Sequence, residues 1–445
     1  MPALPLLLGI DLGTTNIKAI VFDTRGHMHG FASEPTPSFH PRPGWTEHHA
    51  EVLWNATVTA IKRALSEVDA TQVRGVGVAS VGEAGVLVDA RGRQLGPMIA
   101  WHDGRTTPQF RQWQAHVEPG LATRQAGMPP RPIYTLFKLM WLRENAPDAY
   151  QHAARWLLVA DYVVYRLCGA QITDYSLASR TLLFDLRARR WSRELLDSAG
   201  LRHDLLPDLV PAGEPVGTIS PEAAAATGLT TETIVGSGGH DHIVGALAAG
   251  VVRAGQCLDS LGTAEAVFLP FDQAPPDAIV NQTSCTIGAH VARNRLFALE
   301  GLWSGGASVA WARSILTPGE PGFAALERLA AGAQPASGGA MFLPRLAGGE
   351  RGAFVGLSTA TGPAEMARAV YEGLAFEWRR YLERIEQVFG LHADSIRVIG
   401  GGARSAIWVQ TKADVLGRRL SVLELEESVA LGAALLGGLA AGVYA

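Results

Sequence analysis

One stretch near the N-terminus, residues 6–23, constrains the fold more than any other part of the sequence. It reads LLLGIDLGTTNIKAIVFD, which is an apolar run, a turn of small residues and a second apolar run. Two short apolar runs separated by a glycine-containing turn predict the two strands of a β-hairpin. In this turn Gly13 lets the backbone approach a ligand, while backbone N–H groups and threonine hydroxyls can donate hydrogen bonds to an anion. The turn is therefore a candidate phosphate-binding site.

Asp11 stands at the end of the first predicted strand, directly before this turn. Mg²⁺ in proteins usually binds one or two carboxylates together with phosphate oxygens, so Asp11 is a candidate metal ligand, acting through water. The simpler alternative is an ordinary hairpin in which the aspartate only caps its own turn.

A second copy of the same design appears in the other half of the chain. Residues 257–269 read CLDSLGTAEAVFL, again an apolar run, a Leu-Gly-Thr turn and another apolar run. Leu12-Gly13-Thr14 and Leu261-Gly262-Thr263 thus occupy comparable places, which indicates an internal duplication. Two related lobes with a cleft between them are the expected result.

Length and composition agree with a globular protein of two domains. At 445 residues the chain exceeds the size at which one core stops growing, and 47% hydrophobic with 18% charged residues is typical of well-packed domains. A formal charge of −4 gives no basic surface for nucleic acid, since the run at 187–190 is short and is interpreted as a solvated surface.

The remaining compositional signals concern location. No apolar run approaches 18 residues, so no membrane span is expected, and the first apolar run leads into Gly9 and Asp11 as a core strand does, not as a signal peptide does. Cys168, Cys257 and Cys285 are few and far apart, which predicts neither a disulfide framework nor a CxxC metal site. We therefore expect a cytoplasmic protein.

Motifs spread over nearly the whole chain resemble those of the FGGY family of carbohydrate kinases, in the superfamily that also holds actin, hexokinase and the heat-shock chaperone ATPases. GIDLGTTN at 9–16 is shared with the chaperones, but the full set is more specific. Its members are PGWTE at 43–47, WHDGRT at 101–106, KLMWLREN at 138–145, GHDHIVGALAAG at 239–250, SLGTAE at 260–265, ARAVYEGLAFE at 367–377 and GGGARSAIW at 400–408.

This resemblance implies an α/β fold of two actin-like (ribonuclease H-like) lobes with a cleft between them. We expect the boundary near residue 246, with residues 1–246 binding the sugar and carrying the first phosphate loop, and residues 247–445 carrying the second phosphate loop and binding adenosine. It also implies ATP-dependent phosphorylation of a hydroxyl on a sugar, ketose or polyol, with Mg²⁺. A homodimer is compatible with the sequence.

The candidate general base is Asp241. It follows the predicted strand 234–239 and precedes the predicted helix 243–249, so its carboxylate is held rigidly where it can accept the proton of the attacking hydroxyl. The family's catalytic aspartate occupies this position. The alternative is that Asp241 only caps its helix. His240 and His242 flank it, but two histidines without a third ligand are weak evidence for zinc, and contact with a ligand or core packing is the preferred interpretation.

The nucleotide site is expected to combine the two turns with the glycines that follow the predicted strand 396–399. Lys18 stands where related kinases keep a basic residue near the phosphates, a role that fails if its side chain points away from them. Gly306 matches a further nucleotide-contacting glycine of the family. The residues expected to contact ATP are Gly13, Thr14, Thr15, Asn16, Lys18, Gly262, Thr263, Gly306, Gly401, Gly402 and Ala403, with Asp11 as the metal ligand.

Glu83, which follows the predicted strand 73–80, falls where glycerol-phosphorylating members carry a substrate-binding glutamate. Their neighbouring arginine is Gly82 here, and their substrate tyrosine is Ile133, with Tyr134 one step away. The Met-His pair of the ketopentose kinases is absent as well. These departures argue against glycerol, and a ketopentose such as xylulose is the first candidate on family frequency, followed by other ketoses and tetritols.

Further substrate contacts are expected from His102, Asp103, Asp241 and His242. An aspartate and an arginine two residues apart can align a polyhydroxyl ligand or can pair with the scaffold, and we assign contact to His102 and Asp103 and a structural role to Arg105. The segment 172–186 resembles the one that closes over the sugar from one side.

Two rival functions use the same fold. A chaperone-type ATPase requires a peptide-binding domain after its lobes, for which this sequence leaves no room. A catalytically idle sugar or nucleotide sensor keeps the cleft and loses the base, whereas Asp241 and both turns are present here.

Overall fold

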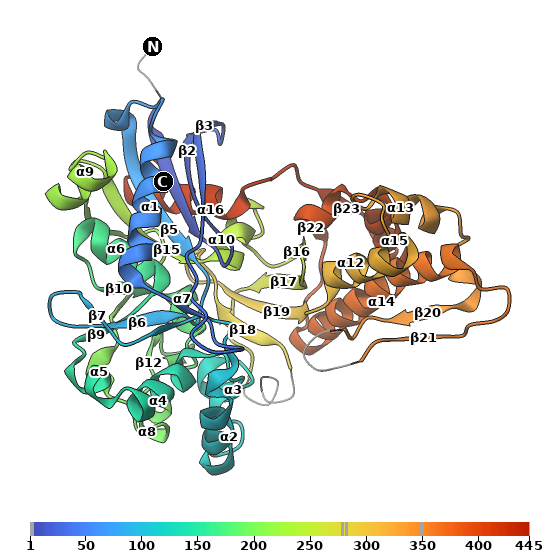
Figure 1. Cartoon of the computed structure of the whole chain (residues 1–445), viewed down its shortest axis with the longest axis horizontal. Helices are drawn as coiled ribbons and strands as arrows, with labels where there is room; N and C mark the ends of the chain where they lie inside the picture. The colour runs from blue at the N-terminus through green and yellow to red at the C-terminus, as the bar shows by residue number, and fades with distance from the viewer. Residues whose placement is uncertain (1–3, 277–279, 281–283, 347–350, 445) are drawn as a thin grey trace.

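The computed structural model describes residues 4–276, 280, 284–346 and 351–444 and consists of two α/β lobes, on the left and right of Figure 1. Each lobe is built on a six-stranded sheet. The largest cluster of buried apolar side chains lies in the first lobe, and two further clusters form the core of the second. The predicted fold of two actin-like lobes is confirmed by this arrangement.

The sheet of the first lobe contains the hairpin predicted from residues 6–23. Its first strand is buried along nearly its whole length, since neighbours cover both faces, and this explains the continuous apolar run. That strand pairs antiparallel with the second strand of the hairpin and parallel with residues 73–80. In sheet order the strands are β14 (Pro215–Thr218), β15 (Ile234–His240), β5 (Val73–Ser80), β1 (Leu6–Leu12), β2 (Asn16–Asp23) and β3 (Met28–Pro35).

Five strands of the sheet of the second lobe repeat the order from β15 to β3 in the opposite direction, and β18 is an additional edge strand. In sheet order its strands are β18 (Thr286–Ala289), β19 (Leu296–Leu302), β17 (Glu265–Phe271), β16 (Gln256–Leu261), β22 (Ser395–Ile399) and β23 (Leu420–Val422). β16 pairs antiparallel with β17 and parallel with β22, as β1 does with β2 and β5. The two predicted turns therefore join equivalent hairpins, and the inferred duplication is confirmed at the level of topology.

Some of the helices pack on these sheets, and others lie away from them at the lower end of the first lobe (Figure 1). The longest, α14, spans 27 residues, and among the described residues no helix is both long and apolar enough to cross a membrane. The principal helices are α1 (Ala50–Ala64), α4 (Thr135–Asn145), α6 (Val159–Cys168), α7 (Tyr175–Ser179), α10 (Asp241–Ala248), α12 (Gly305–Leu316), α14 (Pro363–Phe389), α15 (Ala406–Leu416) and α16 (Ser428–Ala440). Shorter helices are α2 (Thr107–His116), α3 (Leu121–Ala126), α5 (Pro147–His152), α8 (Arg193–Ser198), α9 (Pro221–Thr227) and α13 (Ala324–Ala331).

The last helix, α16, returns to the first lobe, where it lies among the N-terminal strands in Figure 1. Glycines make this close packing possible: a Cβ built on Gly9 would lie 1.8 Å from the carbonyl oxygen of Ala430, and one on Gly77 would lie 2.0 Å from that of Ala433. The predicted second lobe, residues 247–445, therefore includes a helix that packs on the first sheet.

The first lobe also contains small sheets, and one of them shows that a prediction from the sequence is wrong. The sequence of residues 153–167 predicts a single helix, but its first part is strand β9 (Arg155–Leu158), which pairs with β6 (Gly85–Val88) before α6 begins. Trp156 and Leu157 fill the core there, so tertiary packing overrides the helical pattern. The other short strands are β4 (Glu47–His48), β7 (Gln94–Leu95), β8 (Met98–Ile99), β10 (Ile172–Asp174), β11 (Phe184–Asp185), β12 (Arg190–Trp191), β13 (Asp208–Val210), β20 (Met341–Leu343) and β21 (Ala353–Val355).

Candidate active site

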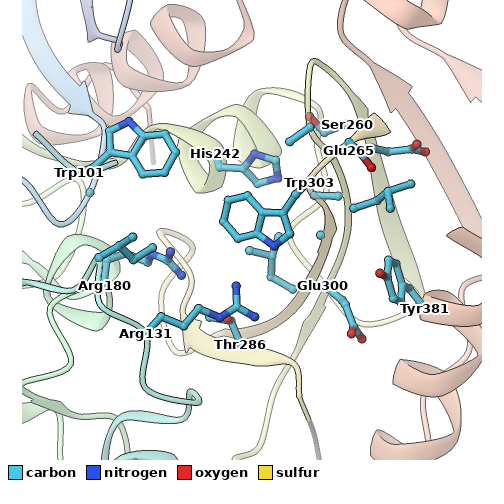
Figure 2. A pocket seen from close by; sticks show the side chains of 18 of the residues that line it. Trp101, Arg131, Arg180, His242, Ser260, Glu265, Thr286, Glu300, Trp303 and Tyr381 are labelled. Atoms are coloured by element: carbon cyan, nitrogen blue, oxygen red, sulfur yellow. The ribbon is translucent and has the colours of Figure 1, made fainter. Parts of the chain in front are cut away.

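A cavity of about 580 Å³ is lined by residues from both lobes (Figure 2). The first lobe contributes the end of β5, the first turn and the start of α10, and the second lobe contributes β16, β17, β19 and the residues after them. Among the predicted site residues, those that line the cavity are Thr14, Glu83, Asp241 and His242. A pocket with a few convergent polar groups between two lobes is the expected form of a small-molecule site.

Asp241 is the first residue of α10, at the end of β15, and its carboxylate opens into the cavity. The N–H of His242 donates to Asp241 Oδ1 at 2.6 Å, and Nδ1 of His240 lies 3.2 Å from the same oxygen. Removal from bulk water, and next the nearby charge of Asp11, raise the pKa of Asp241 to about 7. A carboxylate with a pKa near neutrality is suited to accept a proton.

The two histidines beside Asp241 are half-buried and neutral at physiological pH. Burial lowers the pKa of His242 to about 4 and that of His240 well below its ordinary value, and in both cases the positive charge of Arg180 acts in the same direction. In the described part of the chain no cluster of three or more His, Cys, Asp or Glu side chains could hold a metal ion. This geometry gives the zinc interpretation of the two histidines no support.

Asp11 faces Lys18 across the first hairpin. Burial raises its pKa to about 7, with Lys18 opposing and Glu427 reinforcing the shift. The ammonium of Lys18 donates to Glu427 Oε2 at 2.7 Å, so its charge is already paired with the residue that precedes α16. No hydrogen bond joins the Asp11 carboxylate to a described residue, which leaves that carboxylate available to a ligand.

The first turn exposes its hydroxyl groups, as a phosphate-binding turn must. Thr14 and Thr15 are exposed, Asn16 is half-buried, and Nε1 of Trp101 donates to Thr14 Oγ1 at 2.9 Å. The N–H of Gly13 donates to the carbonyl of Asn16, which closes the turn. The hydrogen bond from Trp101 orients the threonine that lines the cavity.

The second turn is held by the start of α12. The N–H of Gly306 donates to the carbonyl of Gly262 at 3.0 Å, and the N–H of Ala307 donates to that of Thr263 at 3.1 Å. A Cβ on Gly306 would lie 2.4 Å from the carbonyl oxygen of Gly262, so glycine permits this approach. Gly262, Thr263 and the next residue, Ala264, are exposed, with Ala264 on the cavity wall.

The glycine segment expected to receive adenosine packs against the base of the second turn and lies outside the cavity lining. Gly400 has φ of 96°, and a Cβ there would lie 2.6 Å from the carbonyl oxygen of Leu261. Gly401 is exposed, and Gly402 and Ala403 are half-buried, just before α15. The structure thus brings this segment next to the second phosphate turn, as a nucleotide spanning both requires.

Glu83 lies at the end of β5 and pairs with an arginine that the sequence analysis did not identify. Arg180, directly after α7, donates from Nη2 to Glu83 Oε1 at 2.5 Å and from Nε to the same oxygen at 2.9 Å. Figure 2 shows Arg180 on the cavity wall below Trp101. The segment 172–186 was predicted to close over the sugar, but the fold alone tells which of its residues faces the cavity.

Two predicted substrate residues do not reach the cavity. Asp103 is fully buried, where it accepts from the N–H of Thr46 at 2.6 Å and from Nη2 of Arg105 at 2.7 Å. His102 is exposed and outside the cavity lining. The structural role expected for Arg105 agrees with this ion pair, whereas the substrate contacts of His102 and Asp103 stay predictions that this geometry does not favour.

The opposite wall carries side chains that the sequence analysis also missed (Figure 2). Glu300 lies on β19, Trp303 directly follows that strand, and Tyr381 comes from α14. The guanidinium of Arg131 lies 5.6 Å from the ring centre of Trp303. Among these unpredicted residues of the cavity lining, only Trp101 could have been found from a sequence motif, since it begins WHDGRT.

Both lobes of the chain match known proteins. The model of the FGGY family of carbohydrate kinases matches its N-terminal domain to residues 6–248 and its C-terminal domain to residues 260–441. The chain is 31% identical to the xylulose kinase of Escherichia coli over 98% of this chain and 90% of that protein, and 29% identical to a glycerol kinase of Saccharolobus islandicus over 98% and 88%. Among solved structures, the xylulose kinase of Rhodospirillum rubrum superposes with a TM-score of 0.91 at 27% identity, over 98% of this chain and 89% of that one.

Proposed function

The chain belongs to the FGGY family of carbohydrate kinases, and from that premise we propose that it phosphorylates a ketopentose such as xylulose. Membership makes it an ATP-dependent phosphotransferase with a carbohydrate acceptor, and the identity of the acceptor is the part that we propose. Similar relatives include xylulose kinases and glycerol kinases alike. Gly82 and Ile133 depart from the glycerol-phosphorylating pattern, so we place ketopentoses first and other ketoses and tetritols next.

The observation that carries this function is the position of Asp241. It lines the cavity between the lobes together with Thr14 of the first turn and Ala264, which follows Thr263 of the second. A hydroxyl bound next to it can give up its proton as the oxygen attacks the terminal phosphorus of ATP. With a pKa of about 7, Asp241 is partly ionised at neutral pH and becomes a competent proton acceptor as the pH rises.

We assign the phosphates of ATP to the two turns. Thr14, Thr15 and Asn16 would bind from the first lobe and Gly262 and Thr263 from the second, through backbone N–H groups and hydroxyls that are exposed. Gly306 supports the second turn from α12 and Gly401 to Ala403 lie where adenosine would continue. Lys18 reaches the phosphates only if its bond to Glu427 breaks.

We assign Mg²⁺ to Asp11. The carboxylates of Asp11 and Asp241 repel each other, and the pKa of each is raised, so the cleft holds an excess of negative charge that a cation would relieve. A single carboxylate with phosphate oxygens and water is an ordinary magnesium site. When bound there, the ion would neutralise charge on the phosphates, and Asp11 would hold it in place.

We assign the lobe boundary to the region near residue 246, so the hinge would lie in α10, which begins at Asp241. Closure of the two lobes about this helix would bring the nucleotide to the acceptor and exclude water from the cavity. Trp303 of the second lobe and Arg131 of the first already contact each other across the cavity mouth.

An ADP-release assay tests this function. The full-length protein is incubated with ATP, Mg²⁺ and, one at a time, ketopentoses, other ketoses, aldoses and polyols. We expect at least one ketose to stimulate ADP release about tenfold or more over the rate without acceptor. No stimulation by any member of the panel would contradict the proposal and favour the idle sensor.

The variant Asp241→Asn tests the assigned base. General-base catalysis contributes typically 10²–10⁴-fold, so we expect kcat to fall by about that factor. The affinity for ADP, measured by calorimetry, should change little because the two turns are intact. Asp148→Asn, on the surface of α5, is the matched control and should keep wild-type activity.

A further inference from the structure

Glu83 has an unusual backbone for its position on the cavity wall. Its φ is 63°, in the left-handed region that non-glycine residues rarely adopt, and its side chain is buried. The hydroxyl of Thr135, at the start of α4, donates to the Glu83 carbonyl at 3.0 Å and holds this conformation. Strained conformations that the surrounding structure enforces gather at functional sites, because they aim a side chain where regular structure would not.

Arg180 approaches Glu83 from a segment almost a hundred residues away. Its Nε and Nη2 both donate to Oε1 of Glu83, and its guanidinium lies 5.5 Å from the ring centre of Tyr134. Oε2 of Glu83 and Nη1 of Arg180 make no hydrogen bond to any described residue. The pair therefore presents one free acceptor and one free donor on a wall of the cavity that also carries Asp241.

Gly82 creates the space for this pair. A Cβ at residue 82 would lie 3.1 Å from Cβ of Arg180 and 2.7 Å from Cδ2 of His240. Any other residue at position 82 would push Arg180 away from Glu83 or His240 away from Asp241. The glycine and the arginine thus belong to one arrangement, in which the positive charge beside Glu83 comes from the end of α7.

We propose that Arg180 is a specificity-determining residue, which binds a hydroxyl group of the acceptor next to the hydroxyl bound by Glu83, the substrate contact already predicted, so that the two side chains form one subsite for adjacent hydroxyls. A hydroxyl both donates and accepts, so one hydroxyl can donate to Oε2 of Glu83 while its neighbour accepts from Nη1 of Arg180. The pair carries no net charge, and Asp241 is close, so the subsite selects a neutral vicinal diol over an anionic sugar acid. This inference rests on the proposed function, since it concerns the acceptor of that reaction.

The test compares Arg180→Met, Arg180→Lys and a control, Arg190→Met, in the full-length enzyme. The acceptor is the compound with the highest rate in the ADP-release assay, together with its monodeoxy analogues. Arg190 is exposed on β12, so Arg190→Met removes one positive charge, as Arg180→Met does, without changing the cavity. For Arg180→Met we expect kcat/KM for the acceptor to fall about 10- to 100-fold, as loss of a hydrogen bond to a charged group predicts. KM for ATP should stay within about twofold.

Deoxy analogues separate binding from a structural role. One analogue should be a poor substrate of the wild type, and Arg180→Met should no longer distinguish it from the parent acceptor, while Arg180→Lys should keep part of the discrimination. If Arg180→Met does not fold, Glu83→Gln and Arg180→Lys are compared with the same analogues. If the wild-type protein phosphorylates no carbohydrate, the proposed function is wrong. An active wild type whose deoxy discrimination survives in these variants overturns the subsite alone.

Discussion

The negative charge of Asp11 disfavours the ionisation of Asp241 and so raises the pKa of Asp241. Burial is the larger cause of the shift at both residues, and each pKa reaches about 7. Two carboxylates that share a poorly hydrated cleft cannot both ionise easily without a cation. The pH dependence of the enzyme should report this coupling.

We predict that kcat/KM for the acceptor rises with pH and levels off above about 7. The reaction needs the ionised form of Asp241, so below its pKa the rate should fall roughly tenfold per pH unit. The measurement is a pH profile between pH 5 and 9, with ADP binding followed over the same range. Asp11→Asn, although less active, should show its midpoint at lower pH, because the neighbouring negative charge is gone. A flat wild-type profile between pH 5 and 7 would contradict the assignment.

The raised pKa of Asp241 also predicts that removing the charge of this side chain stabilises the folded protein. A carboxyl whose pKa is raised by folding stabilises the native state below its unfolded pKa, and this contribution is lost as the pH rises through the folded pKa of about 7. At pH 8 the ionised carboxylate of Asp241 therefore destabilises the native state, and Asp241→Asn should unfold at a higher temperature than the wild type. Calorimetry without ligands checks this. A difference that does not shrink at pH 5, or the same gain in Asp148→Asn, would exclude this cause.

At the scale of elements, a buried cluster of charges joins α15 to the second turn, residues 262–263. Nζ of Lys412 donates to Asp259 Oδ2 at 2.5 Å and to Oε1 of Glu265, and all three side chains are inaccessible to solvent. Glu265 follows the turn directly, and a Cβ on Gly305, the first residue of α12, would lie 3.3 Å from its Oε2. The cluster thus connects the helix after the adenosine segment with both ends of the turn.

We predict that Lys412→Met lowers the free energy of unfolding by about 3–5 kcal/mol, because it leaves two carboxylates buried without their partner. Denaturation by urea measures the change. The triple variant Lys412→Met, Asp259→Asn, Glu265→Gln removes the charges together and should recover most of the loss. Lys62→Met, at the surface of α1, is the control. Equal stability of Lys412→Met and the wild type would show that the ammonium does not hold this cluster.

The packing of α16 on the first sheet gives a second prediction at this scale. Gly77→Ala would place a methyl group 2.0 Å from the carbonyl oxygen of Ala433, so the helix must move outward. Overpacking of this kind costs about 1–3 kcal/mol, which urea denaturation should detect. Gly104→Ala, where nothing lies within 4 Å of the added atom, is the matched control. Equal effects of the two substitutions would exclude close packing as the cause.

Local patterns predicted these elements well where one principle dominated. β5 has the predicted bounds, and α10 begins within two residues of its predicted start. The segment 153–167 failed because its first residues pair with β6, a contact that no local pattern encodes. The return of α16 to the first lobe depends on glycines in two distant segments, so it too could not be predicted from periodicity.

At the scale of the whole molecule, the duplication was predictable because each half repeats the same turn between the same kinds of strand. The composition of the cavity was not, since Arg131 and Trp303 belong to segments without a motif and the resemblance of segment 172–186 did not single out Arg180. The place of Asp241 on the cavity wall could be predicted because a strand, glycines and a helix start identify it. Arg180 could be found only after the fold had placed α7 against the end of β5.

The most direct measurement is a crystal structure with a non-hydrolysable ATP analogue, Mg²⁺ and the acceptor identified by the ADP-release assay. We expect the phosphates between the turns at 13–16 and 262–263, and the acceptor hydroxyl within about 3 Å of the Asp241 carboxylate, in line with the terminal phosphorus. A nucleotide bound elsewhere, or an acceptor whose hydroxyls all lie beyond reach of Asp241, would contradict it.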